Sequence, residues 1–197
     1  MTEAEQIMQI AQKNNGTVTS AMVTKSGLSR GILRYLCDRG KLEQSGRGVY
    51  ILPEILCDEI YTLQIRYKRG IFSHATALFL WGLTDRTPNR YCITFPASYN
   101  VSSARSNNIK TSQSVDSLFE LGLTDIKTPA QNTVRVYNRE RTLCDILRKG
   151  NHTDIQLITY AFKEYVRSPG RDIPLLSAYS KTLKVNEIVR SYLEILL

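Results

Sequence analysis

The chain has 197 residues, of which 42% are hydrophobic and 22% charged, a composition typical of a soluble protein with one large domain or two modest ones. Its apolar runs are too short to span a membrane and its acidic, polar N-terminus does not resemble a signal peptide, so we expect a cytoplasmic protein. The net charge of +8 favours polyanionic partners. The four cysteines and two histidines lack metal-ligand spacing, so we expect reduced thiols, no metal and no cofactor.

Residues 1–52 have the pattern of a winged helix-turn-helix. After Thr2, a suitable N-cap, periodic apolar residues and turn signals predict three helices, at residues 3–13, 20–25 and 29–39. The turn Ser26-Gly27 separates the second helix from the third. Two short alternating segments follow, 41–44 and 49–52, and the intervening glycines allow a tight hairpin. This module places its second helix-turn-helix element in the major groove of DNA.

Basic side chains concentrate in this part of the chain. Residues 25–49 carry six basic side chains and two acidic ones. In the third predicted helix Leu33 and Leu36 share an apolar face, while Arg30 and Arg34 lie one turn apart on the other face and are expected to reach guanine edges. Ser29 and Tyr35 are predicted to contact bases or phosphates, and Arg47 is predicted to contact the backbone or the minor groove. The residues predicted to contact phosphates are Lys25, Arg39 and Lys41. The alternative is a protein-docking module whose basic face is merely solvated.

Pro53 ends this pattern, so we place the domain boundary between residues 52 and 53. Residues 53–197 are predicted to form a mixed αβ domain with a helical C-terminal portion, which makes the whole chain α+β. A strand is expected at residues 90–95 and a second at 133–137. Residues 98–114 are expected to form an exposed polar loop, either alone or with a short strand inside it. The helices are expected at 54–68, after Ser73 up to Gly82, and at 139–148, 154–166, 174–183 and 186–196.

Signatures of enzymes are missing from the sequence. No glycine-rich nucleotide loop, nucleophile elbow or zinc-protease motif is present. The triplet Asp125-Ile126-Lys127, with Asp116 upstream, is the nearest approach to a metal-dependent nuclease motif, but it precedes Thr128-Pro129 and is interpreted as a turn. His74 is either a proton shuttle or, by preference, a hydrogen-bonded residue at a helix start. Arg141 and Asp145 form either a structural ion pair or a recognition surface. We therefore expect no catalytic residue and no enzyme.

Several stretches, taken in order, resemble one family. They are Arg39-Gly-Lys-Leu42, Gly46-Arg-Gly-Val-Tyr50, Ser73-His-Ala-Thr-Ala-Leu78 with Trp81-Gly-Leu83, and Val134-Arg-Val-Tyr137 followed by Glu140-Arg-Thr-Leu-Cys-Asp-Ile-Leu-Arg148. This pattern resembles the AbiEi-type antitoxins of bacterial abortive-infection systems. The first two motifs are common to winged helices, whereas the Ser-His-Ala and Glu-Arg-Thr-x-x-Asp segments are more specific.

The resemblance implies a function in two halves. The N-terminal half is expected to bind inverted repeats in its own promoter and repress the operon. The C-terminal half is expected to counteract a nucleotidyltransferase-like toxin in a type IV system of phage defence, where antitoxin and toxin need not form a complex. The resemblance supplies no catalytic residue.

Two other functions remain open at this point. One is a winged-helix transcriptional regulator whose second domain senses a small ligand. The other is an enzyme whose second domain modifies the toxin or a nucleic acid. Inverted repeats are compatible with a dimer or with two monomers bound side by side, and the operator sequence is not encoded in any pattern.

Overall fold

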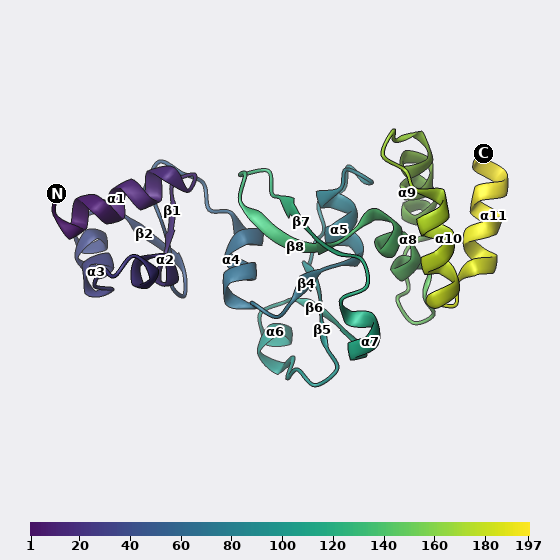
Figure 1. The fold of residues 1–197 in the computed structure, drawn as a ribbon, viewed down its shortest axis with the longest axis horizontal. Coiled ribbons are helices and arrows are strands. Elements are labelled where there is room, and N and C mark those ends of the chain that lie inside the picture. The colour runs from purple at the N-terminus through teal and green to yellow at the C-terminus, as the bar shows by residue number, and fades with distance from the viewer. The chain divides into compact units, whose positions relative to one another are not determined.

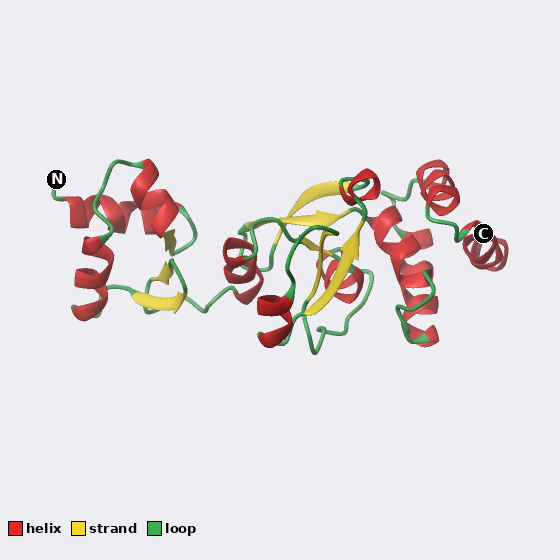
Figure 2. Cartoon of the chain, turned by 90° about the horizontal axis from the view of Figure 1, so that it is seen from below, coloured by secondary structure: helices red, strands yellow, loops and turns green.

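A computed structural model describes all residues from 1 to 197 and divides the chain into two units. The first unit comprises residues 1–68 and 127–134, and the second comprises residues 69–126 and 135–197. Each unit combines helices with one sheet (Figures 1 and 2). The α+β class and the N-terminal winged helix are therefore confirmed. No helix combines the length and apolar character needed to cross a membrane.

The first unit begins with the three predicted helices, α1 (Glu3–Lys13), α2 (Ser20–Lys25) and α3 (Gly31–Asp38). A capping box starts α1, because the Thr2 hydroxyl accepts from Glu5 N while Thr2 N donates to the Glu5 carboxylate. Thr19 caps α2, because its side chain accepts from Met22 N. Apolar faces of the three helices bury a common core that includes Ile7, Ala11, Val18, Val23, Leu33, Leu36 and Leu42.

The wing is an antiparallel sheet of β1 (Thr17–Thr19), β2 (Glu43–Gly46) and β3 (Val49–Ile51), in the order β1-β3-β2. The predicted hairpin is present between β2 and β3. Gly48 has a φ of +74°, a left-handed conformation that glycine adopts without strain. A bulge between Gln44 and Gly46 shifts the register just before the tip.

The helix α4 (Glu59–Arg66) is shorter than the predicted helix at 54–68. Leu56, predicted to lie on its apolar stripe, precedes the helix and is 91% exposed. Asp58 caps α4 by accepting from Tyr61 N at 3.0 Å. Its second carboxylate oxygen accepts from Thr128 Oγ1 at 2.5 Å and from Asn132 Nδ2 at 2.9 Å. This carboxylate ties residues 127–134 to the first unit, which extends beyond the predicted boundary at 52/53.

Replacing Asp58 with alanine is expected to loosen both segments that it joins. The change removes a helix cap and leaves two polar side chains without their acceptor, at an expected cost of about 1–3 kcal/mol. Hydrogen-exchange mass spectrometry should show faster exchange in residues 59–62 and 128–132. Asp85→Ala is the control, because that aspartate is exposed. Unchanged exchange at 128–132 in the Asp58 variant would contradict the assigned role.

The second sheet has the strand order β6-β5-β4-β8-β7. The predicted strands are present as β5 (Cys92–Pro96) and β8 (Thr133–Tyr137), and β6 (Lys110–Ser114) is a short strand inside the predicted loop. The strands β4 (Ile71–Phe72) and β7 (Leu123–Lys127) were not predicted. β4 pairs antiparallel with β5 and parallel with β8, and β5 pairs parallel with β6. The segment expected to be an exposed loop thus contains β6 and the short helix α6 (Ser102–Ser106). The Asp125–Lys127 triplet lies in β7 and not in a turn.

Helices account for the rest of the second unit. They are α5 (His74–Leu80), α7 (Asp116–Phe119), α8 (Arg139–Leu147), α9 (Ile155–Arg167), α10 (Ile173–Thr182) and α11 (Asn186–Leu196). The last four pack together at the C-terminal end of the chain (Figures 1 and 2). Their shared core contains Leu78, Leu143, Ala161, Phe162, Tyr165 and Leu176, and the Phe162 ring stacks on Tyr192 with centroids 4.7 Å apart.

Candidate nucleic-acid interface

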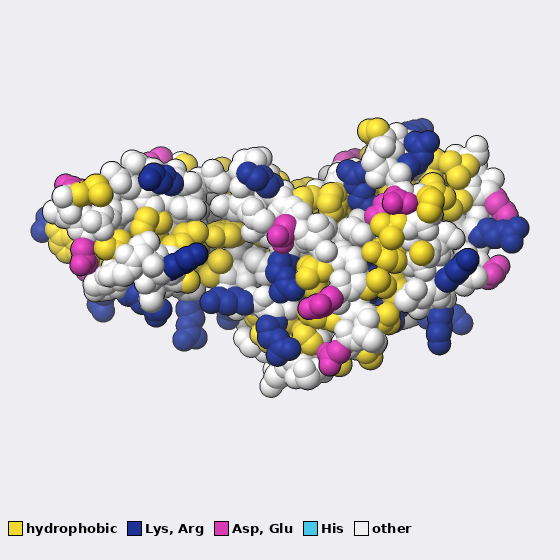
Figure 3. Space-filling model, in the orientation of Figure 1, with side chains coloured by type: hydrophobic (Ala, Val, Ile, Leu, Met, Phe, Trp, Pro, Cys, Tyr) yellow, Lys and Arg dark blue, Asp and Glu magenta, His cyan; other side chains and the backbone are white.

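The eight residues predicted to contact DNA are all solvent-exposed side chains of the winged helix: Lys25, Ser29, Arg30, Arg34, Tyr35, Arg39, Lys41 and Arg47. Figure 3 shows Lys and Arg side chains projecting from the part of the first unit that contains α2 and α3. Their exposure permits DNA contact, and their role in binding stays a prediction.

The helix α3 presents a clear division between its two faces. Leu33 and Leu36 are each only 1% exposed and fix the helix against the core. Arg34 and Tyr35 lie on the open face, where the Tyr35 ring is covered by the Arg39 guanidinium with its Cζ 5.3 Å from the ring centroid. The arrangement holds a cation and an aromatic ring side by side on the surface that a recognition helix presents to a groove.

Two of the predicted contacts are already engaged within the protein. Arg30 Nε donates to Thr24 Oγ1 at 2.6 Å, which bridges the turn between α2 and α3. Ser29 Oγ accepts from Gly31 N at 3.3 Å, and Ser29 N lies 3.4 Å from Glu3 Oε2. The geometry therefore orients Arg30 through α2, and it places the Glu3 carboxylate beside a predicted phosphate contact. The sequence pattern gave no sign of either contact.

The wing tip carries Arg47 in the turn between β2 and β3. A side chain at Gly46 would meet Thr62 Cγ2 at 2.6 Å, because α4 packs closely behind the hairpin. Helix α4 therefore supports the wing, and a Cβ at Gly46 would force the hairpin away from it. The glycines of this segment predict the tight turn, but no sequence pattern indicates this close approach.

The charged residues of α8 belong to the interior of the second unit. Arg141 Nε is 2.9 Å from Asp145 Oδ2, and the two side chains are 1% and 3% exposed. Arg141 Nη1 also donates to the carbonyls of Leu118 and Leu121 at 2.7 and 3.1 Å, and its guanidinium lies over the Tyr137 ring. Of the two interpretations left open for this pair, burial favours the structural ion pair over a recognition surface.

His74 starts α5 in a left-handed conformation with a φ of +50°. Its Nδ1 lies 2.9 Å from Ser73 Oγ, and burial lowers the pKa of the imidazole. The carboxylates of Asp116 and Asp125 belong to α7 and β7. No group of three or more His, Cys, Asp or Glu side chains is placed to hold a metal ion.

Comparison with known proteins supports the architecture. Residues 5–53 match the family model described as "Transcriptional regulator, AbiEi antitoxin". The fold is similar to the crystal structure of the RV2827C protein from Mycobacterium tuberculosis, with a TM-score of 0.53 and 16% identity over 94% of this chain and 78% of that chain. The comparison with curated proteins found no match. The winged helix of this chain, residues 5–53, is thus similar to the AbiEi antitoxin transcriptional regulators, the family that the sequence resembles.

Proposed function

We propose that this protein is an antitoxin that also represses its own operon. The observation that carries the proposal is the match of residues 5–53 to AbiEi regulators, on a winged helix whose exposed side chains are strongly basic. In this proposal α3 enters the major groove at inverted repeats in the promoter, and Arg47 on the wing contacts the backbone or minor groove.

The arginines and lysines of the proposed interface suit different contacts with DNA. The planar guanidinium of Arg34 can donate two hydrogen bonds to a guanine edge. Beside it, the Arg39 guanidinium lies over the Tyr35 ring, and both can contact a base or a phosphate. Lysines such as Lys25 and Lys41 supply charge without fixed geometry, so they contribute to affinity for any duplex. Sequence preference is therefore assigned to Arg34 in α3 and to Arg30 at the N-cap of this helix.

The second proposed activity resides in residues 53–197, the predicted antitoxin domain. There the chain counteracts a nucleotidyltransferase-like toxin in a type IV arrangement of phage defence, in which a stable complex of the two proteins is not required. The polar groups of α8 support the structure of this domain, because Arg141, Asp145 and Glu140 are buried in ion-pair and hydrogen-bond contacts. A cytoplasmic location accords with both activities.

A growth-rescue experiment with full-length protein tests the proposal. The neighbouring toxin gene is induced from a promoter that this protein does not regulate, and a reporter carries the protein's own promoter. Wild type is expected to restore growth and silence the reporter, whereas Arg34→Ala restores growth and leaves the reporter active. Failure of wild type to restore growth would reject the antitoxin activity. Loss of growth rescue by a folded Arg34→Ala protein would show that rescue requires DNA binding.

A further inference from the structure

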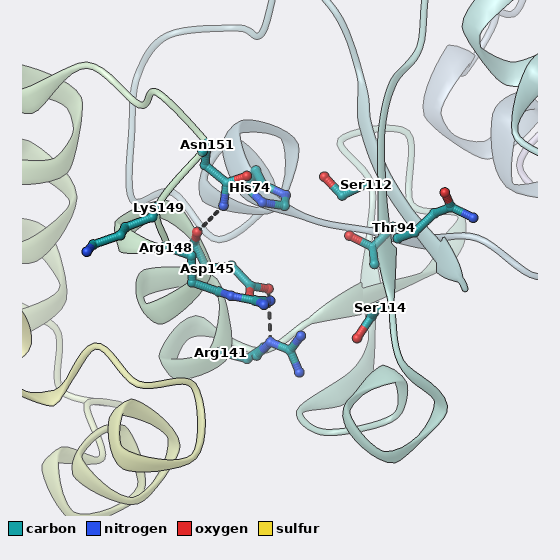
Figure 4. Close-up of a pocket in the computed structure, with 11 residues that line it drawn as sticks. His74, Thr94, Ser112, Ser114, Arg141, Asp145, Arg148, Lys149 and Asn151 are labelled. Carbon is teal, nitrogen blue, oxygen red and sulfur yellow. Dashed lines mark hydrogen bonds and ion pairs between the residues drawn. The ribbon is translucent and has the colours of Figure 1, made fainter. Parts of the chain in front are cut away.

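A cavity of about 280 Å³ lies within the second unit, on the side of the sheet covered by α8 (Figure 4). Helix α8 contributes Arg141 and Asp145, and the segment that follows it contributes residues 148–151. The opposite wall is formed by hydroxyl side chains of the paired strands β5 and β6, and His74 of α5 completes the lining. These hydroxyls belong to Thr94, Ser112 and Ser114. Thr94 pairs directly with Ser112, so the two side chains emerge on one face of the sheet.

The charge of the cavity is positive. Three cations line it, Arg141, Arg148 and Lys149, against the single carboxylate of Asp145. That carboxylate is already neutralised, because one oxygen is 2.9 Å from Arg141 Nε and the other is 3.7 Å from Arg148 Nη1. Just outside, Lys110 Nζ lies 3.4 Å from the carbonyl of Asn151 and adds a further positive charge. The electrostatic field therefore favours an anion.

The lining also presents donors that the protein itself leaves unused. Ser73 Oγ accepts from Thr94 Oγ1 at 2.9 Å and lies 2.9 Å from Nδ1 of His74. The other ring nitrogen of His74, Nε2, makes no hydrogen bond within the protein. The Ser112 hydroxyl and Lys149 Nζ likewise have no internal partner. The left-handed backbone conformation of His74 is strained and has to be held in place by the surrounding structure. Such strained residues are common at binding sites.

From this lining we infer that the cavity binds a phosphate-bearing ligand, with the Arg148 guanidinium and the Ser112 hydroxyl as donors to the phosphoryl oxygens. The Lys149 side chain points away from the cavity in Figure 4 and adds positive charge nearby. Charge-assisted donors around a concave site are the usual chemistry of phosphate recognition. The volume is slightly below the roughly 300–1,000 Å³ of pockets that enclose a drug-sized molecule. The cavity therefore takes the phosphoryl end of its ligand, and any nucleoside attached to it remains outside. This site is separate from the winged helix.

Isothermal titration calorimetry on the full-length protein tests the inference, at one fixed ionic strength. Inorganic phosphate, pyrophosphate and ATP are the probes, and adenosine is the probe without phosphate. Saturable binding of at least one phosphate compound is expected, and the Arg148→Gln/Lys149→Gln double variant should weaken it on the order of tenfold or more, because a charge-assisted contact and a second nearby positive charge are lost. If phosphate or pyrophosphate binds, a free anion is a sufficient ligand for the cavity. If only ATP binds among the three phosphate compounds, the ligand is a nucleotide.

The matched control is Lys163→Gln/Arg167→Gln, which removes the same charge from exposed positions of α9. We expect this variant to bind as wild type does, and Arg34→Ala to do so as well. Imidazole NMR provides a second readout, because the chain has only two histidines and His74 is the one in the cavity. Absence of saturable binding by all three phosphate compounds would overturn the inference. So would equal weakening by the two double variants, or adenosine binding as tightly as ATP.

Discussion

Replacing Arg141 with methionine is expected to lower the unfolding free energy of the second unit by about 3–5 kcal/mol. The pair with Asp145 is almost completely buried, and its loss leaves that carboxylate with only the more distant Arg148. The carbonyls of Leu118 and Leu121 also lose their donor. Breaking one half of a buried ion pair is costly because the remaining charge stays desolvated.

Urea denaturation followed by tryptophan fluorescence measures this effect. The only tryptophan is Trp81, whose indole donates to the carbonyl of Tyr137 at 2.8 Å, so its emission reports on this unit. Arg167→Met is the control, because the Arg167 side chain is 74% exposed and its pair with Glu164 is worth less than about 1 kcal/mol. If Arg141→Met unfolded at the same urea concentration as the control variant, the assigned importance of the buried pair would be wrong.

Substituting Arg34 by alanine is expected to cost about 1–3 kcal/mol of binding free energy on the cognate promoter site and to relax sequence preference. The side chain projects from the open face of α3, which Leu33 and Leu36 hold in place from behind. Since the truncation leaves those anchors untouched, the fold should be preserved. The loss then reports on the contact itself.

Fluorescence anisotropy with the promoter repeat and a scrambled duplex separates the two kinds of contact. Arg34→Ala should weaken the promoter complex more than the scrambled one, whereas Lys41→Ala should weaken both about equally and reduce the salt dependence. Equal affinity of Arg34→Ala and wild type for the promoter repeat would refute the assignment of α3 as the reading helix.

Helices were predictable in this chain because their signals are local. The N-cap at Thr2 and the apolar spacing of α3 depend on neighbours within a few residues, and both occur as expected. The position of the strand β6 could not be predicted, because Lys110–Ser114 is polar throughout and lies at the sheet edge, where no alternating apolar face is needed. The strand β4 has only two residues, too few to show any period.

In the candidate sites, too, features set by neighbouring residues were predictable, whereas features set by contacts between distant segments were not. Exposure of the basic face of α3 followed from the position of Leu33 and Leu36, and the structure agrees. Burial of Arg141 and Asp145 was not predictable, because a charged pair four residues apart is usually solvated. Only the partners brought in by the fold, such as the Leu118 carbonyl, make a buried guanidinium possible. The cavity beside it is likewise a product of strand pairing between distant segments.

The carboxylate of Asp58 has a consequence for how this protein can be cut or recombined. Because residues 127–134 belong to the first unit, the backbone passes between the units at three places, after residues 68, 126 and 134. A chimaera that exchanges only residues 1–52 keeps α4, so the new hairpin has to pack against the helix that Gly46 contacts here. A chimaera that also exchanges Asp58 and α4 leaves Thr128 and Asn132 without their acceptor. Exchange of DNA-binding specificity between relatives is therefore simplest by substitutions on α3, with the rest of the unit retained.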